Sequence, residues 1–151
     1  MEWFQSEWQL LSRHLMVAGV LSPTARRPNL AAHYPTRPGG INWARVAGSA
    51  TQDVPDPAAA EFNGAVMAFW EDHVPVPGEA LATLITDFVD GAFELSVATF
   101  LTNANALCSL PQNLYLIDPA MAWCFCYEKS NIVHFGVSSK TGSGTRRHRR
   151  E

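Results

Sequence analysis

The chain has 151 residues, of which 47% are apolar and 17% charged, and its net charge is −3. This composition is typical of one globular domain and excludes disordered and collagen-like chains. The longest apolar stretch near the N-terminus, residues 15–21, is far shorter than the roughly 20 residues that a membrane span needs, and no secretory signal pattern precedes it. We therefore expect no membrane span and a cytoplasmic protein.

The first predicted element is an amphipathic helix over about residues 3–18. Phe4, Trp8, Leu11 and Leu15 recur at spacings of three and four, and Gly19 follows as a stop signal. Residues 22–56 hold five of the ten prolines, with a sixth at Pro57, together with scattered Trp, Tyr and Ile residues. Because a solvated linker has little use for aromatic residues, this segment is interpreted as a long ordered loop.

Two further helices are predicted, over about residues 57–73 and 78–90. Asp56 and Pro57 suit the N-cap and first helical position of the earlier one. In the later one, apolar residues recur at i, i+3, i+4, i+7 and i+8 from Leu81, and Gly91 suits its C-terminal cap.

After Gly91 the apolar period changes from 3.6 to 2, which predicts strands over about residues 92–101, 113–117, 122–128 and 132–137. Their short connections favour antiparallel neighbours. The predicted fold is therefore α+β, with N-terminal helices packed on one face of a four-stranded antiparallel meander. Residues 1–139 are expected to form a single domain, and residues 140–151, which include no apolar residue, a flexible basic tail.

The net charge hides a strong segregation along the chain. Residues 46–128 include eleven carboxylates and no Lys or Arg, whereas the segments before and after them are basic. A surface with charges of one sign steers association with a partner of opposite charge. The alternative, which is equally common, is an acidic surface that is solvated and only favours solubility. The predicted partner-binding carboxylates are Glu61 and Asp72 on one helix and Glu79, Asp87 and Asp90 on the next.

No catalytic or metal signature accompanies this pattern. Cys124 and Cys126 alternate with aromatic residues in a strand, so we expect them to be small buried side chains. Cys108, His134 and Asp118 could form a Cys/His site only if the fold brought them together. The histidines lack zinc-site spacing, no glycine-rich phosphate loop is present, and the arginines of the tail have no interleaved aromatic residue for base stacking. We therefore predict no cofactor or metal. For the tail, we favour a flexible solubilising end over a nucleic-acid-binding segment.

The stretch Leu114-Tyr-Leu-Ile-Asp-Pro-Ala-Met-Ala-Trp-Cys-Phe-Cys-Tyr-Glu128, followed by Asn131-Ile-Val-His-Phe-Gly136, resembles the C-terminal hairpins of small α+β immunity proteins. These proteins belong to bacterial polymorphic-toxin and contact-dependent inhibition systems. The resemblance covers about residues 78–138 and implies a cytoplasmic, non-catalytic protein that neutralises one cognate toxin. A basic toxin, such as a nuclease, is the partner that the acidic segment favours. The alternatives are a general interaction adaptor or chaperone-like module and, third, a small Cys/His enzyme.

Overall fold

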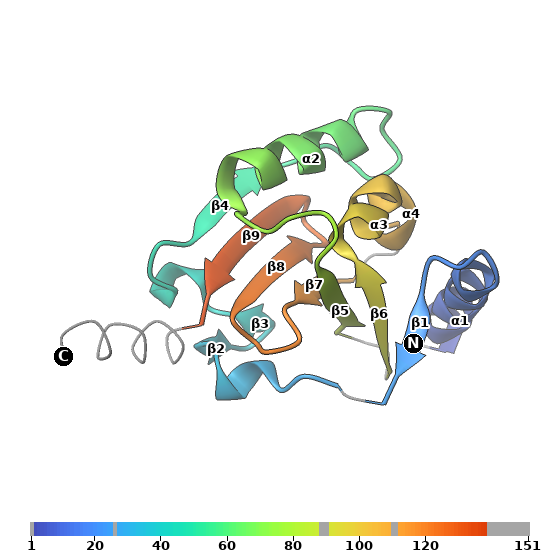
Figure 1. Ribbon diagram of the computed structural model, residues 1–151, viewed down its shortest axis with the longest axis horizontal. Helices are drawn as coiled ribbons and strands as arrows, with labels where there is room; N and C mark the ends of the chain where they lie inside the picture. The colour runs from blue at the N-terminus through green and yellow to red at the C-terminus, as the bar shows by residue number, and fades with distance from the viewer. Residues whose placement is uncertain (1, 26, 88–90, 110–111, 139–151) are drawn as a thin grey trace.

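A computed structural model describes residues 2–25, 27–87, 91–109 and 112–138 (Figure 1). The predicted tail, residues 140–151, and Asp90 lie outside the described residues. The helices are α1 (Glu2–Val17), α2 (Phe62–His73), α3 (Val97–Thr102) and α4 (Ala104–Leu107), and short 3-10 turns span Leu30–Ala32 and Trp43–Arg45. The strands are β1 (Ser22–Thr24), β2 (Thr36–Arg37), β3 (Gly40–Ile41), β4 (Ala50–Asp53), β5 (Leu81–Thr86), β6 (Ala92–Ser96), β7 (Leu114–Ile117), β8 (Trp123–Glu128) and β9 (Ile132–Val137).

The strands form a seven-stranded antiparallel sheet in the order β1-β6-β5-β7-β8-β9-β4, beside a small β2–β3 hairpin. The α+β class is confirmed, and three of the four predicted strands occur as β7, β8 and β9 within a residue of their predicted bounds. The four-stranded meander is wrong, because the sheet has seven strands and β5 lies between β6 and β7.

The prediction of a helix over residues 78–90 is wrong, because residues 81–86 form the central strand β5. Five consecutive residues of β5, from Ala82 to Thr86, are buried, because both faces of the sheet are covered there. A strand that is buried on both faces is a continuous apolar run without a period of two. Its leucines and isoleucine therefore fit a helical spacing by chance, whereas the β-branched Thr83, Ile85 and Thr86 favour a strand.

The predicted strand over residues 92–101 ends at Ser96, and the chain continues as helix α3. The Ser96 hydroxyl oxygen accepts a hydrogen bond from the Thr99 amide at 3.1 Å, which caps the new helix. The alternating pattern continues past Ser96 in the sequence, but this N-cap determines where the strand ends.

Helix α1 agrees with the predicted first helix, while α2 begins later than expected. Gly19 has a φ of +79° and ends α1 in the left-handed conformation that suits glycine. Asp56 does not cap α2: its carboxylate accepts from the Ala58 amide at 2.9 Å in a turn, and the helix begins only at Phe62. The predicted apolar side of α2 is buried.

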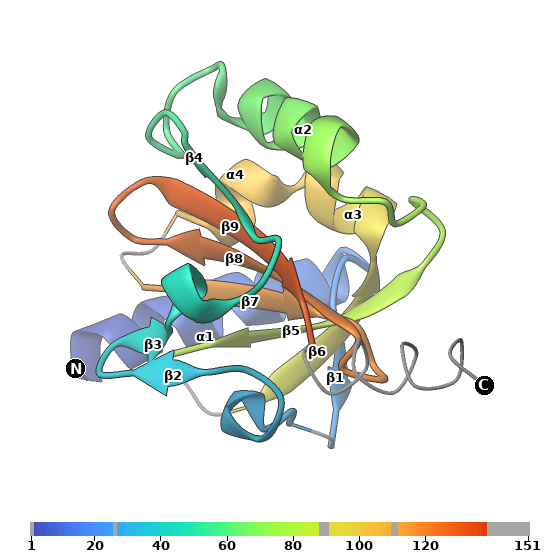
Figure 2. The ribbon, with the colours of Figure 1, turned by 90° about the vertical axis from the view of Figure 1, so that its left-hand side faces the viewer.

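The sheet has a helix-covered face and a loop-covered face (Figures 1 and 2). Helices α2, α3 and α4 lie on one side, and the segment that carries β2, β3 and both 3-10 turns lies on the other. Helix α1 lies at the β1–β6 end of the sheet, where the Trp8 and Phe93 rings meet edge to face at 6.0 Å. No helix within the described residues is both long and apolar enough to span a membrane.

Phe125 is the centre of the core on the helix-covered face. Its ring lies 5.2 Å from Trp70, 5.6 Å from Phe100 and 6.0 Å from Phe69, measured between centroids, and it is fully buried. Such aromatic contacts join β8 to α2 and α3.

On the loop-covered face, the proline-rich segment forms the second core. Tyr34, Ile41, Trp43 and Val46 pack against alternate residues of the central strands. The segment is packed against the sheet, as interpreted, but it is not a loop throughout, because it carries β1 to β4 and both 3-10 turns. Its aromatic residues cover this face.

The first testable prediction concerns Phe125. Replacement by Ala removes the ring that three aromatic neighbours share, and should lower the free energy of unfolding by about 3–5 kcal/mol. Urea denaturation followed by tryptophan fluorescence measures this change. The control is Leu10→Ala, because Leu10 is 60% exposed and its truncation should cost little. A small loss in F125A would contradict the central position of this ring.

A second prediction tests the loop cover through Gly136. A Cβ atom at this position would lie 2.6 Å from Val46 Cγ1 and 3.1 Å from the Trp43 ring. We expect G136A to destabilise the fold by about 1–3 kcal/mol, and V46A to recover part of that loss in the double variant. Gly64→Ala in α2 is the matched control, since no atom lies near its added Cβ and alanine favours a helix. Equal effects of the two glycine substitutions would contradict this account.

Candidate functional site

The predicted partner-binding residues occupy three separate places. Glu61 and Asp72 are exposed at the two ends of α2, as predicted. Glu79 is exposed in the turn before β5, and Asp87 follows the other end of that strand, which is about 20 Å long. Since residues 81–86 form a strand, Glu79 and Asp87 lie at opposite ends of it and not on one helical face, and Asp90 lies outside the described residues.

The outer face of α2 brings Glu61 and Asp72 together with Glu71. Eleven residues separate Glu61 from Asp72, which is three helical turns, so both lie on the same side of the helix about 16 Å apart. The residues between them on this side are the exposed Gly64 and Ala68. We call these five residues the α2 face. It has carboxylates at both ends and small residues between them, and Met67, 42% exposed, lies at its side.

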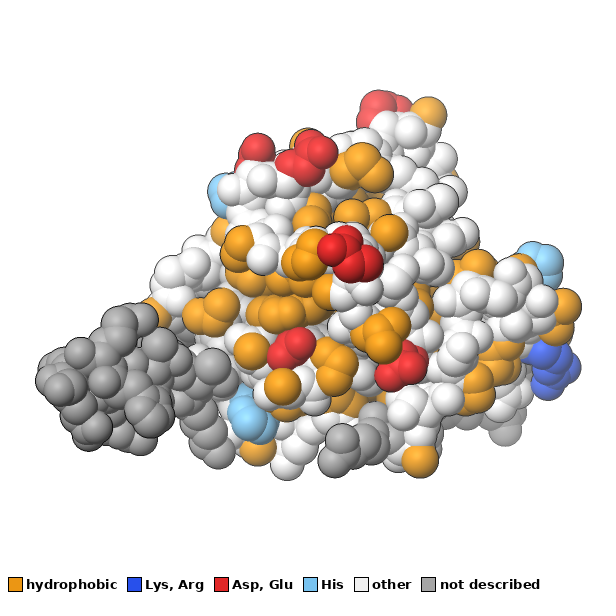
Figure 3. Space-filling model, viewed as in Figure 1, with side chains coloured by type: hydrophobic (Ala, Val, Ile, Leu, Met, Phe, Trp, Pro, Cys, Tyr) orange, Lys and Arg blue, Asp and Glu red, His pale blue; other side chains and the backbone are white. Residues whose placement is uncertain are grey.

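The carboxylates of the α2 face are not neutralised within the described part of the chain. Glu61, Glu71 and Asp72 make no ion pair with any described residue. In Figure 3 acidic side chains lie over α2, and the Lys and Arg side chains that this view shows lie over α1 at the far end. The α2 face can therefore attract a basic surface over several ångströms, since no neighbouring cation cancels its field.

Asp87 lies on the opposite side of the sheet, next to Tyr115. Burial raises the pKa of its carboxyl group, and hydrogen bonds with Tyr115 and Asn113 and the charges of Lys129 and Arg27 partly oppose that rise. Asp87 is therefore a member of a mixed-charge cluster on the loop-covered face, and it does not extend the α2 face.

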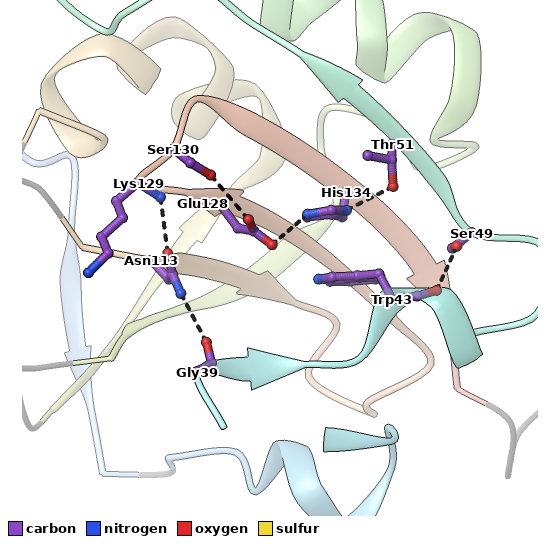
Figure 4. Close-up of polar contacts among 9 residues, drawn as sticks. All are labelled: Gly39, Trp43, Ser49, Thr51, Asn113, Glu128, Lys129, Ser130 and His134. Atoms are coloured by element: carbon purple, nitrogen blue, oxygen red, sulfur yellow. Dashed lines mark hydrogen bonds and ion pairs between the residues drawn. The ribbon is translucent and has the colours of Figure 1, made fainter. Parts of the chain in front are cut away.

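Three polar side chains on the loop-covered face are linked in series by hydrogen bonds, and the predicted partner-binding residues do not include them. Glu128 Oε2 lies 2.7 Å from His134 Nε2, and the other ring nitrogen, Nδ1, lies 2.8 Å from the Thr51 hydroxyl (Figure 4). The Trp43 ring stacks on the imidazole at 4.9 Å and 5°. The register of the β8–β9 hairpin places Glu128 and His134 on the same face of the sheet. No sequence motif indicates this pair, so it could be found only from the register.

This chain of hydrogen bonds joins the edge strand to the sheet. Thr51 lies directly opposite His134 in the β4–β9 register, and Trp43 belongs to the loop cover. A hydroxyl, an imidazole and a carboxylate in series can also activate a nucleophile, but the cavities of about 540 Å³ and 400 Å³ on this face are not lined by Thr51 or His134. We therefore assign the chain a structural role.

The residues of the Cys/His hypothesis are not brought together. Cys108 lies in the core of the helix-covered face, and His134 lies on the loop-covered face. All three cysteines are buried and free, and burial raises the pKa of the Cys108 and Cys124 thiols far above their ordinary value, so neither supplies a thiolate. Among the described residues, no group of three His, Cys, Asp or Glu side chains could hold a metal ion.

Comparisons with known proteins found no match among family models, curated proteins or solved structures.

The third prediction concerns the pH dependence of stability. Burial lowers the pKa of His134 in the folded protein, although the Glu128 carboxylate partly opposes this. As the pH falls from 7.5 to 5, the unfolded chain therefore binds a proton at this residue more readily than the folded chain, and the free energy of unfolding decreases. We expect a shallower decrease in H134Q and a larger one in E128Q, which lacks the charge that favours imidazolium.

Urea denaturation at several pH values measures these slopes. Asp87 titrates with the opposite sign, because its pKa is raised, but it is present in all three proteins and cancels in the comparison. An identical slope in the wild type and H134Q would show that His134 has the same pKa in both states.

Proposed function

We propose that the protein is a cytoplasmic immunity-type inhibitor that binds a basic protein toxin through its α2 face. One observation carries this proposal: three carboxylates on the α2 face have no ion-pair partner among the described residues, and the exposed Gly64 and Ala68 between them have little or no side chain. The resemblance of residues 114–136 to immunity-protein hairpins supports the same function. An inhibitor of this kind works by occupying the partner's surface and needs no reactive group of its own.

The geometry favours a protein partner with a convex or flat basic surface. Gly64 and Ala68 present little relief, so a partner can approach the helix backbone closely. Met67 adds a flexible apolar contact beside the carboxylates. The carboxylates favour fast association and correct orientation of a basic partner. The small and apolar residues between and beside them, Gly64, Met67 and Ala68, supply area that the partner can bury.

The fourth prediction tests this interface with the double variant Glu71→Gln, Asp72→Asn. The natural probe is the product of the adjacent open reading frame, because an immunity gene is expected beside its toxin gene. Co-expression with the wild-type protein should restore growth, and the purified proteins should form a complex. We expect the double variant to associate about tenfold more slowly at low salt, with the difference disappearing at high salt.

The matched control is Glu7→Gln, Asp53→Asn, which removes the same charge from α1 and β4 and leaves the α2 face unchanged. If the control slows association as much as the double variant, net charge rather than this surface attracts the partner. If the neighbouring product is harmless and does not bind, the proposal is wrong. Comparable binding to several unrelated proteins would favour the general adaptor instead.

A further inference from the structure

An open cavity of about 540 Å³ lies on the loop-covered face, away from the α2 face. Strands β5 and β6 supply Thr83 and Glu94 to its lining, and the chain before β2 supplies Asn29 and His33. Pro28 and Met121 provide apolar walls. The cavity thus combines side chains from three distant parts of the sequence, and the fold alone brings them together.

Among the polar side chains that line this cavity, Glu94 alone accepts hydrogen bonds without donating any. Thr83 lies directly opposite Glu94 in the β5–β6 register, so their side chains are neighbours on the same face. The Glu94 carboxylate is exposed and has no ion-pair partner among the described residues. The His33 Nδ1 atom is buried and has no hydrogen-bond partner there, an arrangement that costs free energy unless something binds it.

Arg27 also borders the cavity, but its guanidinium group has a structural use. Its Nη1 atom donates to the Gly91 carbonyl at 2.7 Å, and its Nη2 atom donates to the Thr86 carbonyl at 2.9 Å. These hydrogen bonds join the end of β5 to the residue before β6. Both terminal nitrogens of Arg27 thereby donate to the backbone, and Glu94 is the carboxylate in the lining of the cavity.

We propose that this cavity binds a guanidinium group carried on an aliphatic stem. A guanidinium is planar, has five N–H donors and no acceptor, and pairs with a carboxylate through two parallel hydrogen bonds. Glu94 takes that pair, while the Thr83 hydroxyl and the His33 Nδ1 atom, with the ring proton on Nε2, accept from the remaining donors. Pro28 and Met121 contact the aliphatic stem. The group belongs either to an arginine side chain of a protein partner or to a free guanidine compound.

The test is a titration of the ¹⁵N-labelled full chain with N-acetyl-arginine N-methylamide, followed by amide chemical shifts. We expect saturable shifts at Asn29, Thr83 and Glu94. The citrulline analogue, which has the same shape without the charge, should bind at least tenfold more weakly. Because Glu94 is exposed, Glu94→Gln should leave the fold intact and weaken binding of the arginine probe at least tenfold. Asp53→Asn, an equal change of charge elsewhere, should have no effect.

Three results would overturn the proposal: no saturable shift, shifts confined to other residues, or equal affinity of the wild type and E94Q. The source of the group is a separate arm of the experiment. If E94Q also weakens the complex with the protein partner, an arginine of that partner occupies the cavity; if E94Q affects the probe alone, the ligand is a free guanidine compound. Because the probe titration needs no partner, it can succeed when the proposed immunity function fails, and the reverse also holds.

Discussion

The central strands of the sheet are buried on both faces, and the rest of the structure depends on this constraint. All residues of β7, and all but one at the end of β5 and of β8, are buried. A sheet with two apolar faces needs a cover on each. Helices α2 to α4 cover one face, and the proline-rich segment covers the other with Tyr34, Ile41, Trp43 and Val46. The Glu128–His134–Thr51 chain and the cavity beside Glu94 both lie on the face that this second cover encloses.

The same constraint explains which parts of the fold could be predicted. Strands β8 and β9 were predictable because Asp118-Pro119 and residues 129–131 mark their turns, and short connections leave only an antiparallel neighbour. Strand β5 was not, because burial on both faces removes the alternation that distinguishes a strand from a helix. Its position between β6 and β7 depends on pairing with strands that follow it in the sequence, and no local sequence pattern indicates that pairing.

For the candidate site, the residues on α2 could be predicted from the sequence, whereas the position of Asp87 could not. The exposure of Glu61 and Asp72 follows from the helical period and the buried positions of Phe62, Val66 and Phe69, so it could be predicted. The position of Asp87 could not, because it depends on which strand lies beside β5. The carboxylates of the acidic segment thus differ in their surroundings. On the loop-covered face, Asp87 and Glu128 meet cations or imidazole, whereas Glu94 and the carboxylates of the α2 face have no ion-pair partner among the described residues.

The α2 face and the Glu94 cavity are independent surfaces for a geometric reason. Helix α2 packs on β8 through Phe62, Phe69 and Trp70, and the cavity opens by β5 and β6 on the other face. Three strand spacings separate β8 from β6 along the sheet, about 14 Å, and the sheet itself lies between the two surfaces. A compact partner seated on α2 cannot reach Glu94 without passing around an edge of the sheet. Sensitivity of one complex to substitutions on both surfaces would therefore require a partner that extends around that edge, whereas separate sensitivities identify two ligands.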